Sequence, residues 1–230
     1  MSLLLALLAA FFVNSTLAAD NYIQVQGRCQ TKVSPDRAMI TFTAENQSKN
    51  QKEAFAKTNQ QINNLKEQIK KLNLEKLELK NTSYTVYPVR EYEKEKVVDK
   101  GIRVSLSLEV MTSQIERIGE TLELASKEGI TNVGSLGTFL SQEKNQAEYL
   151  KCLDVASDDA RAKAKQLAKK LDVGLGQVVR VIESPATVPT PVYHERAMMK
   201  SAMSDAGGSP AIEPGTQEFS TTIEVSFGIK

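Results

Sequence analysis

One long stretch of the chain carries a stripe of small apolar residues at helical spacing. Between Gln142 and Asp172, apolar side chains recur every three or four positions, which is the spacing of one face of an α-helix. Three successive members of this stripe are alanines, so little side-chain volume separates the helix from its partner. We therefore predict a helix that ends before Gly174 and lies close against a β-sheet. The stripe consists of Tyr149, Leu153, Ala156, Ala160, Ala164, Leu167 and Leu171.

Two further stretches have the helical spacing. The first begins at Ser48 and Gln51, which stand in the spacing of a capping box. The second begins at a similar pair, Ser113 and Glu116, and is stopped by Gly129. The polar residues of both stretches fall on the opposite face, so both helices are predicted to be amphipathic.

Alternating apolar and polar residues predict strands between these helices. The turn residues at 34–36 predict a hairpin between the first two strands. The charged run EYEKEKVVDKG predicts the solvated tip of a second hairpin. Gly27 interrupts the first strand, at a point where the backbone is expected to bend or pack closely. The predicted strands are 22–33, 38–45, 77–89, 102–110, 133–140, 175–182 and 219–227.

Strands in local pairs, separated by helices, favour an α+β fold. We predict antiparallel sheets with the long amphipathic helices packed on one face, arranged as two lobes within a single unit at 20–230. The segment 183–215 is an exception, because it holds five of the seven prolines and is too long for an ordinary connection. It is either a disordered loop or a docking surface between subunits. The predicted oligomer contact consists of Val188, Val192, Tyr193, Met198, Met199 and Met203.

Residues 1–19 have the character of a secretory signal peptide, which predicts an exported protein. The apolar run 3–13 is too short to span a bilayer as a helix, and it is followed by polar residues and then by Ala18 and Ala19. The run lacks the usual preceding Lys or Arg, and a buried N-terminal helix is the alternative. No later segment is long and apolar enough to cross a membrane. We expect a soluble mature protein in the periplasm or on the outer cell surface.

The charge and the residue types argue against nucleic-acid binding and against most catalytic chemistry. Lys and Arg number 29 and Asp and Glu 28, for a net charge of +1, which removes the attraction on which nucleic-acid binders depend. The only histidine, His194, has no nucleophile motif near it in the sequence. Asp158 and Asp159 are neighbours on a helix and diverge, which indicates helix surface. We expect no catalytic residue, cofactor or metal, and hence no enzyme.

Cys29 and Cys152 are the two cysteines of the chain. In an exported protein they can form a disulfide, or they can be two small buried apolar residues. A third possibility is a redox thiol, which would make the chain a thiol-dependent antioxidant enzyme that works through Cys152 or Cys29. A binding module for a small apolar ligand is a further alternative.

Several stretches together resemble one known family. They are VQGRCQTKVSPDRAMITF, SYTVYPV, GIRVSLSLEV, ASKEGITNVGSLGTFLS, DDARAKAKQLAKKLDVGLGQVVRVIE and IEPGTQEFSTTIEVSFGI. Over 22–229 the chain resembles the SIMPL-domain family, in the branch of YggE-like and periplasmic immunogenic proteins, and DARxKAxxLAxxL is the most specific match. It departs from the family at Cys29, where members commonly carry a small residue such as Gly.

The resemblance implies an exported α+β protomer that builds large ring-shaped assemblies and is linked loosely to protection against oxidative stress. It offers no catalytic residues to carry over. The leading hypothesis is therefore a non-enzymatic cell-envelope protein that forms a homo-oligomer.

Overall fold

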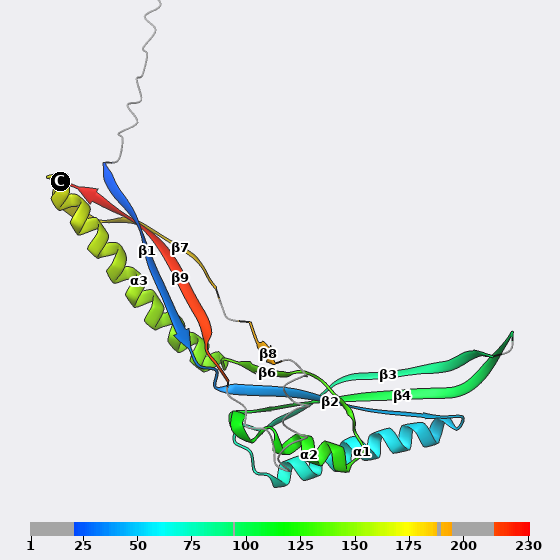
Figure 1. Ribbon diagram of the computed structural model, residues 1–230. Helices are drawn as coiled ribbons and strands as arrows, with labels where there is room; N and C mark the ends of the chain where they lie inside the picture. The colour runs from blue at the N-terminus through cyan, green and yellow to red at the C-terminus, as the bar shows by residue number, and fades with distance from the viewer. Residues whose placement is uncertain (1–20, 94, 188–189, 195–213) are drawn as a thin grey trace, which may run out of the picture.

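Two antiparallel sheets, each covered by helix on one face, form an elongated and bent molecule (Figure 1). The predicted α+β class is confirmed. The computed structural model describes residues 21–93, 95–187, 190–194 and 214–230, and every structural statement below concerns these residues. Each sheet has its own hydrophobic core, so the chain forms two lobes.

The first lobe is a three-stranded sheet covered by one long helix. The strand order is β1 (Tyr22–Val33), β9 (Gln217–Ile229), β7 (Leu175–Thr187), and the helix is α3 (Gln142–Lys170). The last strand of the chain thus lies between its neighbours, with Val225 opposite Val25. This confirms that the closing strand returns to the sheet.

The second lobe is a six-stranded sheet with two helices on one face (Figure 1). The strand order is β3, β4, β2, β6, β8, and β5 pairs with β2. The core lies between the sheet and α1, where Phe42, Ile62 and Leu108 are almost fully buried. The elements are β2 (Arg37–Ser48), α1 (Gln51–Lys71), β3 (Glu78–Glu93), β4 (Lys96–Thr112), a 3-10 helix (Ile115–Arg117), α2 (Glu120–Lys127), β5 (Asn132–Val133), β6 (Leu136–Phe139) and β8 (Val192–His194).

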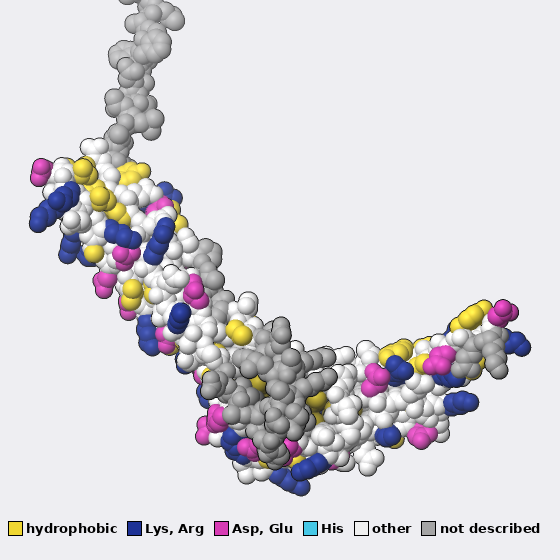
Figure 2. Space-filling model, viewed as in Figure 1, with side chains coloured by type: hydrophobic (Ala, Val, Ile, Leu, Met, Phe, Trp, Pro, Cys, Tyr) yellow, Lys and Arg dark blue, Asp and Glu magenta, His cyan; other side chains and the backbone are white. Residues whose placement is uncertain are grey.

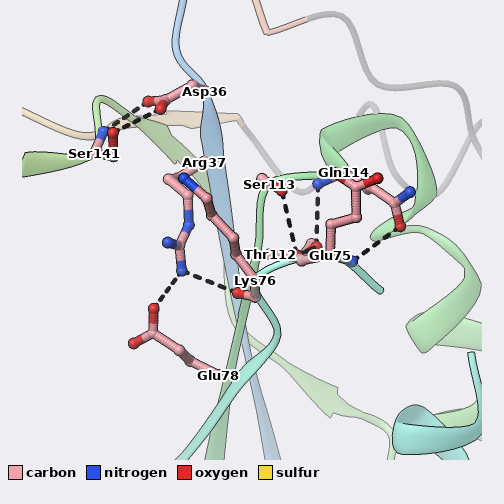
Figure 3. A network of polar contacts seen from close by, with 9 residues as sticks. All are labelled: Asp36, Arg37, Glu75, Lys76, Glu78, Thr112, Ser113, Gln114 and Ser141. Atoms are coloured by element: carbon pink, nitrogen blue, oxygen red, sulfur yellow. Dashed lines mark hydrogen bonds and ion pairs between the residues drawn. The ribbon is translucent and has the colours of Figure 1, made fainter. Parts of the chain in front are cut away.

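The predicted hairpin between the first two strands is wrong. β1 pairs with β9 and β2 pairs with β4, so the turn at 34–36 carries the chain from one lobe to the other. The Asp36 carboxylate explains this, because it accepts hydrogen bonds from the backbone N–H of Ser141 at 2.7 Å and from its hydroxyl at 2.6 Å (Figure 3). Ser141 caps α3, so the turn is fixed to the second crossing between the lobes. The other predicted hairpin, β3 with β4, is confirmed.

Both predicted capping boxes are wrong in detail. The side chain of Asn50 caps α1, and Ser48 donates instead to the carboxylate of Glu53 at 2.8 Å. The hydroxyl of Ser113 is directed at the carbonyl oxygen of Glu75 at 3.3 Å, within the polar network at the end of the six-stranded sheet (Figure 3). The side chain that capping statistics assign to the helix is thus engaged elsewhere, by a local contact at Ser48 and by a tertiary contact at Ser113.

Part of the segment predicted as one long loop is regular. Residues 183–187 complete β7, and Val192–His194 form β8, which pairs with β6. Residues 188–189 and 195–213, together with the predicted signal peptide at 1–19, lie outside the described residues.

Candidate functional site

The buried face of α3 is a row of small residues that are spaced four apart. The row differs from the predicted stripe at its C-terminal end, where Leu167 and Leu171 are 42% and 63% exposed. The helix lies so close to the sheet that leucine side chains find no room beneath it, and they are displaced to its flanks. The row consists of Cys152, Ala156, Ala160, Ala164 and Ala168.

Gly27 of β1 marks the closest approach between strand and helix. A Cβ atom at this position would overlap the carbonyl oxygen of Ala156 and lie 2.8 Å from the Cβ of Ala160. This confirms that Gly27 packs closely against its surroundings. The glycine and the alanines together allow the backbones of β1 and α3 to touch.

Two charged side chains of α3 bond to backbone groups in the middle of the outer edge of β1. Asp159 accepts the backbone N–H of Arg28 at 2.8 Å, and the Lys163 ammonium donates to the carbonyl oxygen of Gln26 at 2.9 Å and to Asp159 at 2.6 Å. The hydrogen bond from Lys163, followed by that from Arg28, lowers the pKa of Asp159. Asp159 was predicted to lie on the helix surface, and in addition it bonds α3 to the backbone of β1. The signal in the sequence was an Asp and a Lys four apart, one turn of helix, beside the alanine row.

A disulfide joins Cys29 to Cys152, with the two Cα atoms 5.3 Å apart. Both residues are buried, and Cys29 stands two positions after Gly27 on the same face of β1. The bond therefore continues the close strand-to-helix contact by one further turn of α3. Neither cysteine keeps a free thiol.

Among the described residues, the opposite edge of the same sheet is open. β7 is the outer strand on the side of β9 away from β1 (Figure 1), and residues 177–184 are exposed. Its large apolar side chains keep much of their surface in solvent: Val178 44%, Val179 60%, Val181 58% and Ile182 38%. A long apolar edge strand of this kind is a template for pairing with another chain. The sequence pattern did not indicate this open edge, because apolar residues in a strand are expected to be buried.

A second exposed apolar surface lies at the tip of the β3–β4 hairpin, which extends beyond α1 (Figure 1). Tyr92 and Val97 are opposite one another there and are 74% and 66% exposed. Figure 2 shows apolar side chains at this tip among charges of both signs. The described residues of the chain leave these two side chains uncovered, so contact with another molecule would bury them.

The predicted oligomer contact is described only in part. Val192 and Tyr193 lie in β8 at the edge of the six-stranded sheet, and Val192 is 42% exposed. Val188, Met198, Met199 and Met203 lie outside the described residues.

Neither metal-site geometry nor a membrane-spanning helix is found in the described ranges. No group of three or more His, Cys, Asp or Glu residues there is arranged to hold a metal ion. Likewise, none of the helices described is both long and apolar enough to cross a bilayer.

Comparisons with known proteins agree with the resemblance. The model of the SIMPL family, described as "Protein of unknown function (DUF541)", matches residues 23–227. Two similar relatives are each called "26 kDa periplasmic immunogenic protein", one from Brucella melitensis biotype 1 and one from Brucella abortus strain S19. Each is 28% identical to the chain over 214 residues, which cover 90% of the chain and 84% of the relative.

Proposed function

The chain belongs to the SIMPL family, and from that premise we propose that it is an exported, non-enzymatic protein of the cell envelope that assembles with further copies of itself. Its relatives are called periplasmic, and the first residues of the chain read as a signal peptide. The family resemblance implies assembly and a link to oxidative-stress tolerance. Among the described residues, no constellation of catalytic groups argues for an enzyme.

The open β7 edge is the observation that carries the assembly proposal. At the other edge of the same sheet, Asp159 and Lys163 of α3 bond the backbone N–H of Arg28 and the carbonyl oxygen of Gln26, whereas among the described residues no side chain bonds the outer backbone groups of β7. At β7, Val179 and Val181 remain more than half exposed. A second copy that pairs with β7 would bury these apolar side chains. It would also supply hydrogen-bond partners for the outer N–H and C=O groups of the strand.

The two apolar surfaces favour contacts between unlike patches. β7 and the Tyr92–Val97 hairpin tip lie on different lobes and far apart (Figure 1). If the β7 patch of one copy binds the hairpin-tip patch of the next copy, the contact is head-to-tail. Repeated head-to-tail contacts produce rings or open filaments. We therefore expect a higher oligomer instead of an isolated twofold dimer.

Light scattering on the purified chain that lacks residues 1–19 tests the proposal. We expect a mass several times that of the protomer, and a strict monomer at high concentration would overturn the assembly claim. The double variant Val179→Lys, Val181→Lys should lower the oligomer order and leave the circular dichroism spectrum unchanged. Val155→Lys is the matched control, because Val155 is 54% exposed on α3 and lies away from the edge. A separate deletion of 188–203 tests the predicted loop contact.

Fractionation of cells tests export. The full chain should be recovered outside the cytoplasm, whereas the chain that begins at residue 20 should remain inside. Recovery of both forms in the cytoplasm would refute the signal-peptide assignment.

The thiol-dependent enzyme is a weaker candidate, since the disulfide leaves no free thiol to attack a peroxide. A variant with serine at positions 29 and 152 separates this reading from the proposal. If the parent consumes peroxide and the variant does not, the chain is an enzyme.

A further inference from the structure

A hollow of about 380 Å³ opens between α1 and β3, within the size range of small-molecule sites. Five of its six lining residues have polar side chains. Leu106, which is buried, supplies the apolar part. The lining consists of Asn59, Asn81, Thr82, Ser83, Tyr84 and Leu106.

A β-bulge directs two of these side chains to the same side of the sheet. Residues three apart on a regular strand point to opposite faces. In β3, however, Asn81 is opposite Leu108 and Tyr84 is opposite Leu106, because the register shifts between Asn81 and Ser83. Leu106 and Leu108 belong to the core beneath α1, so Asn81 and Tyr84 both lie on the α1 side. Bulges commonly re-aim side chains at functional sites.

α1 completes the hollow from the other side. The ring of Phe55 packs against the ring of Tyr84 with 5.9 Å between the centroids. Asn59 follows Phe55 by one turn of helix, so its amide lies on the same face of α1. The ring contact fixes Tyr84 as one wall and still leaves this residue 48% exposed.

Four polar side chains of the hollow make no side-chain hydrogen bond to any described residue. In the part of the chain that the structure describes, no hydrogen bond or ion pair engages the side chains of Asn59, Asn81, Thr82 or Ser83. Elsewhere in the same lobe comparable amides are used, as where Asn64 and Gln68 donate to the carboxylate of Glu128. Four uncommitted polar side chains around one hollow are therefore available to a ligand.

The lining chemistry selects the class of ligand. No Lys, Arg, Asp, Glu or His lines the hollow, so a charged ligand would lose hydration without gaining a counter-charge. Each Asn amide offers two donors and an acceptor, and each hydroxyl offers one donor and two lone pairs. Such groups match neighbouring hydroxyls of a sugar ring, while the face of Tyr84 can cover its C–H surface. We propose that this hollow binds a neutral saccharide, one or two rings in size.

This inference does not depend on self-assembly. The hollow lies in the six-stranded lobe and shares no residue with β7 or with the Tyr92–Val97 tip. A variant of the hollow should therefore scatter light like the parent, and a β7 variant should bind sugar like the parent.

Saturation-transfer difference NMR on the mature chain provides the test, because it detects weak ligands of large assemblies. The probes are N-acetylglucosamine, glucose and maltose, with glucuronate and glucosamine as charged counterparts. We expect saturable transfer from at least one neutral sugar with a Kd of about 1–10 mM, as suits a shallow open site, and at least fivefold weaker binding of the charged sugars.

Variants of the hollow decide the location of the site. Asn81→Ala and Tyr84→Ala should each raise the Kd at least fivefold, while Tyr22→Ala, a tyrosine of β1 that is exposed to the same extent as Tyr84, should leave it unchanged. Absence of saturable transfer from all three neutral sugars would overturn the proposal. So would equal binding by the parent and both hollow variants, or tighter binding of either charged sugar.

Discussion

Gly27→Ala is the most direct test of the close contact between β1 and α3. The added methyl group would overlap the carbonyl oxygen of Ala156 and stand 2.8 Å from the Cβ of Ala160. A backbone carbonyl cannot rotate away as a flexible side chain can. The helix must therefore move outward, and this movement also stretches the two hydrogen bonds that Asp159 and Lys163 make to the edge of β1.

The size of the effect follows from these contacts. Overpacking in a tight core costs about 1–3 kcal/mol, and the two weakened hydrogen bonds at the surface add a small further cost. Alanine restricts the unfolded chain and returns about 0.5 kcal/mol. Since these two smaller effects roughly offset each other, we expect Gly27→Ala to lower the free energy of unfolding by about 1–3 kcal/mol, and the melting temperature of a chain this size by about 2–12 °C.

Urea unfolding followed by circular dichroism, with the disulfide intact, measures this difference. Gly228→Ala is the matched control, because Gly228 also lies in this sheet and a methyl group there would meet the Val179 side chain at an ordinary 3.5 Å. The control should change stability by less than about 1 kcal/mol. If Gly27→Ala unfolds at the parent's urea midpoint, strand and helix are not in backbone contact and our account of the alanine row fails.

Three further outcomes are expected for the same lobe. Ala160→Leu should cost about 1–3 kcal/mol by overpacking, measured by the same urea titration; a variant that melts like the parent would place the wrong face of α3 inward. Replacing Cys29 and Cys152 by alanine opens a loop of 123 residues and should cost about 4–5 kcal/mol, and the parent in dithiothreitol should lose a similar amount. Lys163 and the N–H of Arg28 lower the pKa of Asp159. Its carboxylate therefore stabilises the fold at pH values above the usual aspartate pKa of about 4, and this stability is lost as the pH falls through the lowered value. Asp159→Asn should accordingly flatten the pH dependence of the urea midpoint in that acid range; an unchanged pH profile would contradict the role given to Asp159.

Elements of both lobes show how much of the candidate surfaces a sequence can reveal. The oligomer contact was predicted in the loop, with Val188 and Val192 among its residues, because apolar residues in a long connection favour a docking surface. The open edge at Val179 and Val181 was not predicted, because valines in a strand are expected to be buried. Their exposure depends on where α3 stops covering the sheet. The hollow at Asn81 and Tyr84 likewise depends on a bulge that no local pattern in β3 announces.

By itself the sequence determined the helices, most of the strands, the close approach at Gly27 and the family, since these depend on local periodicity, residue size and motif. Only the tertiary structure decided that β1 and β2 belong to different sheets, and that Asp159 bonds to the outer edge of β1. It also decided that the described residues leave the outer edge of β7 exposed. The physical reason is that a strand's pattern records that one face is buried, and it does not record which partner buries it. Pairing is chosen by the whole chain, here through a closing strand that begins more than 180 residues after β1 ends.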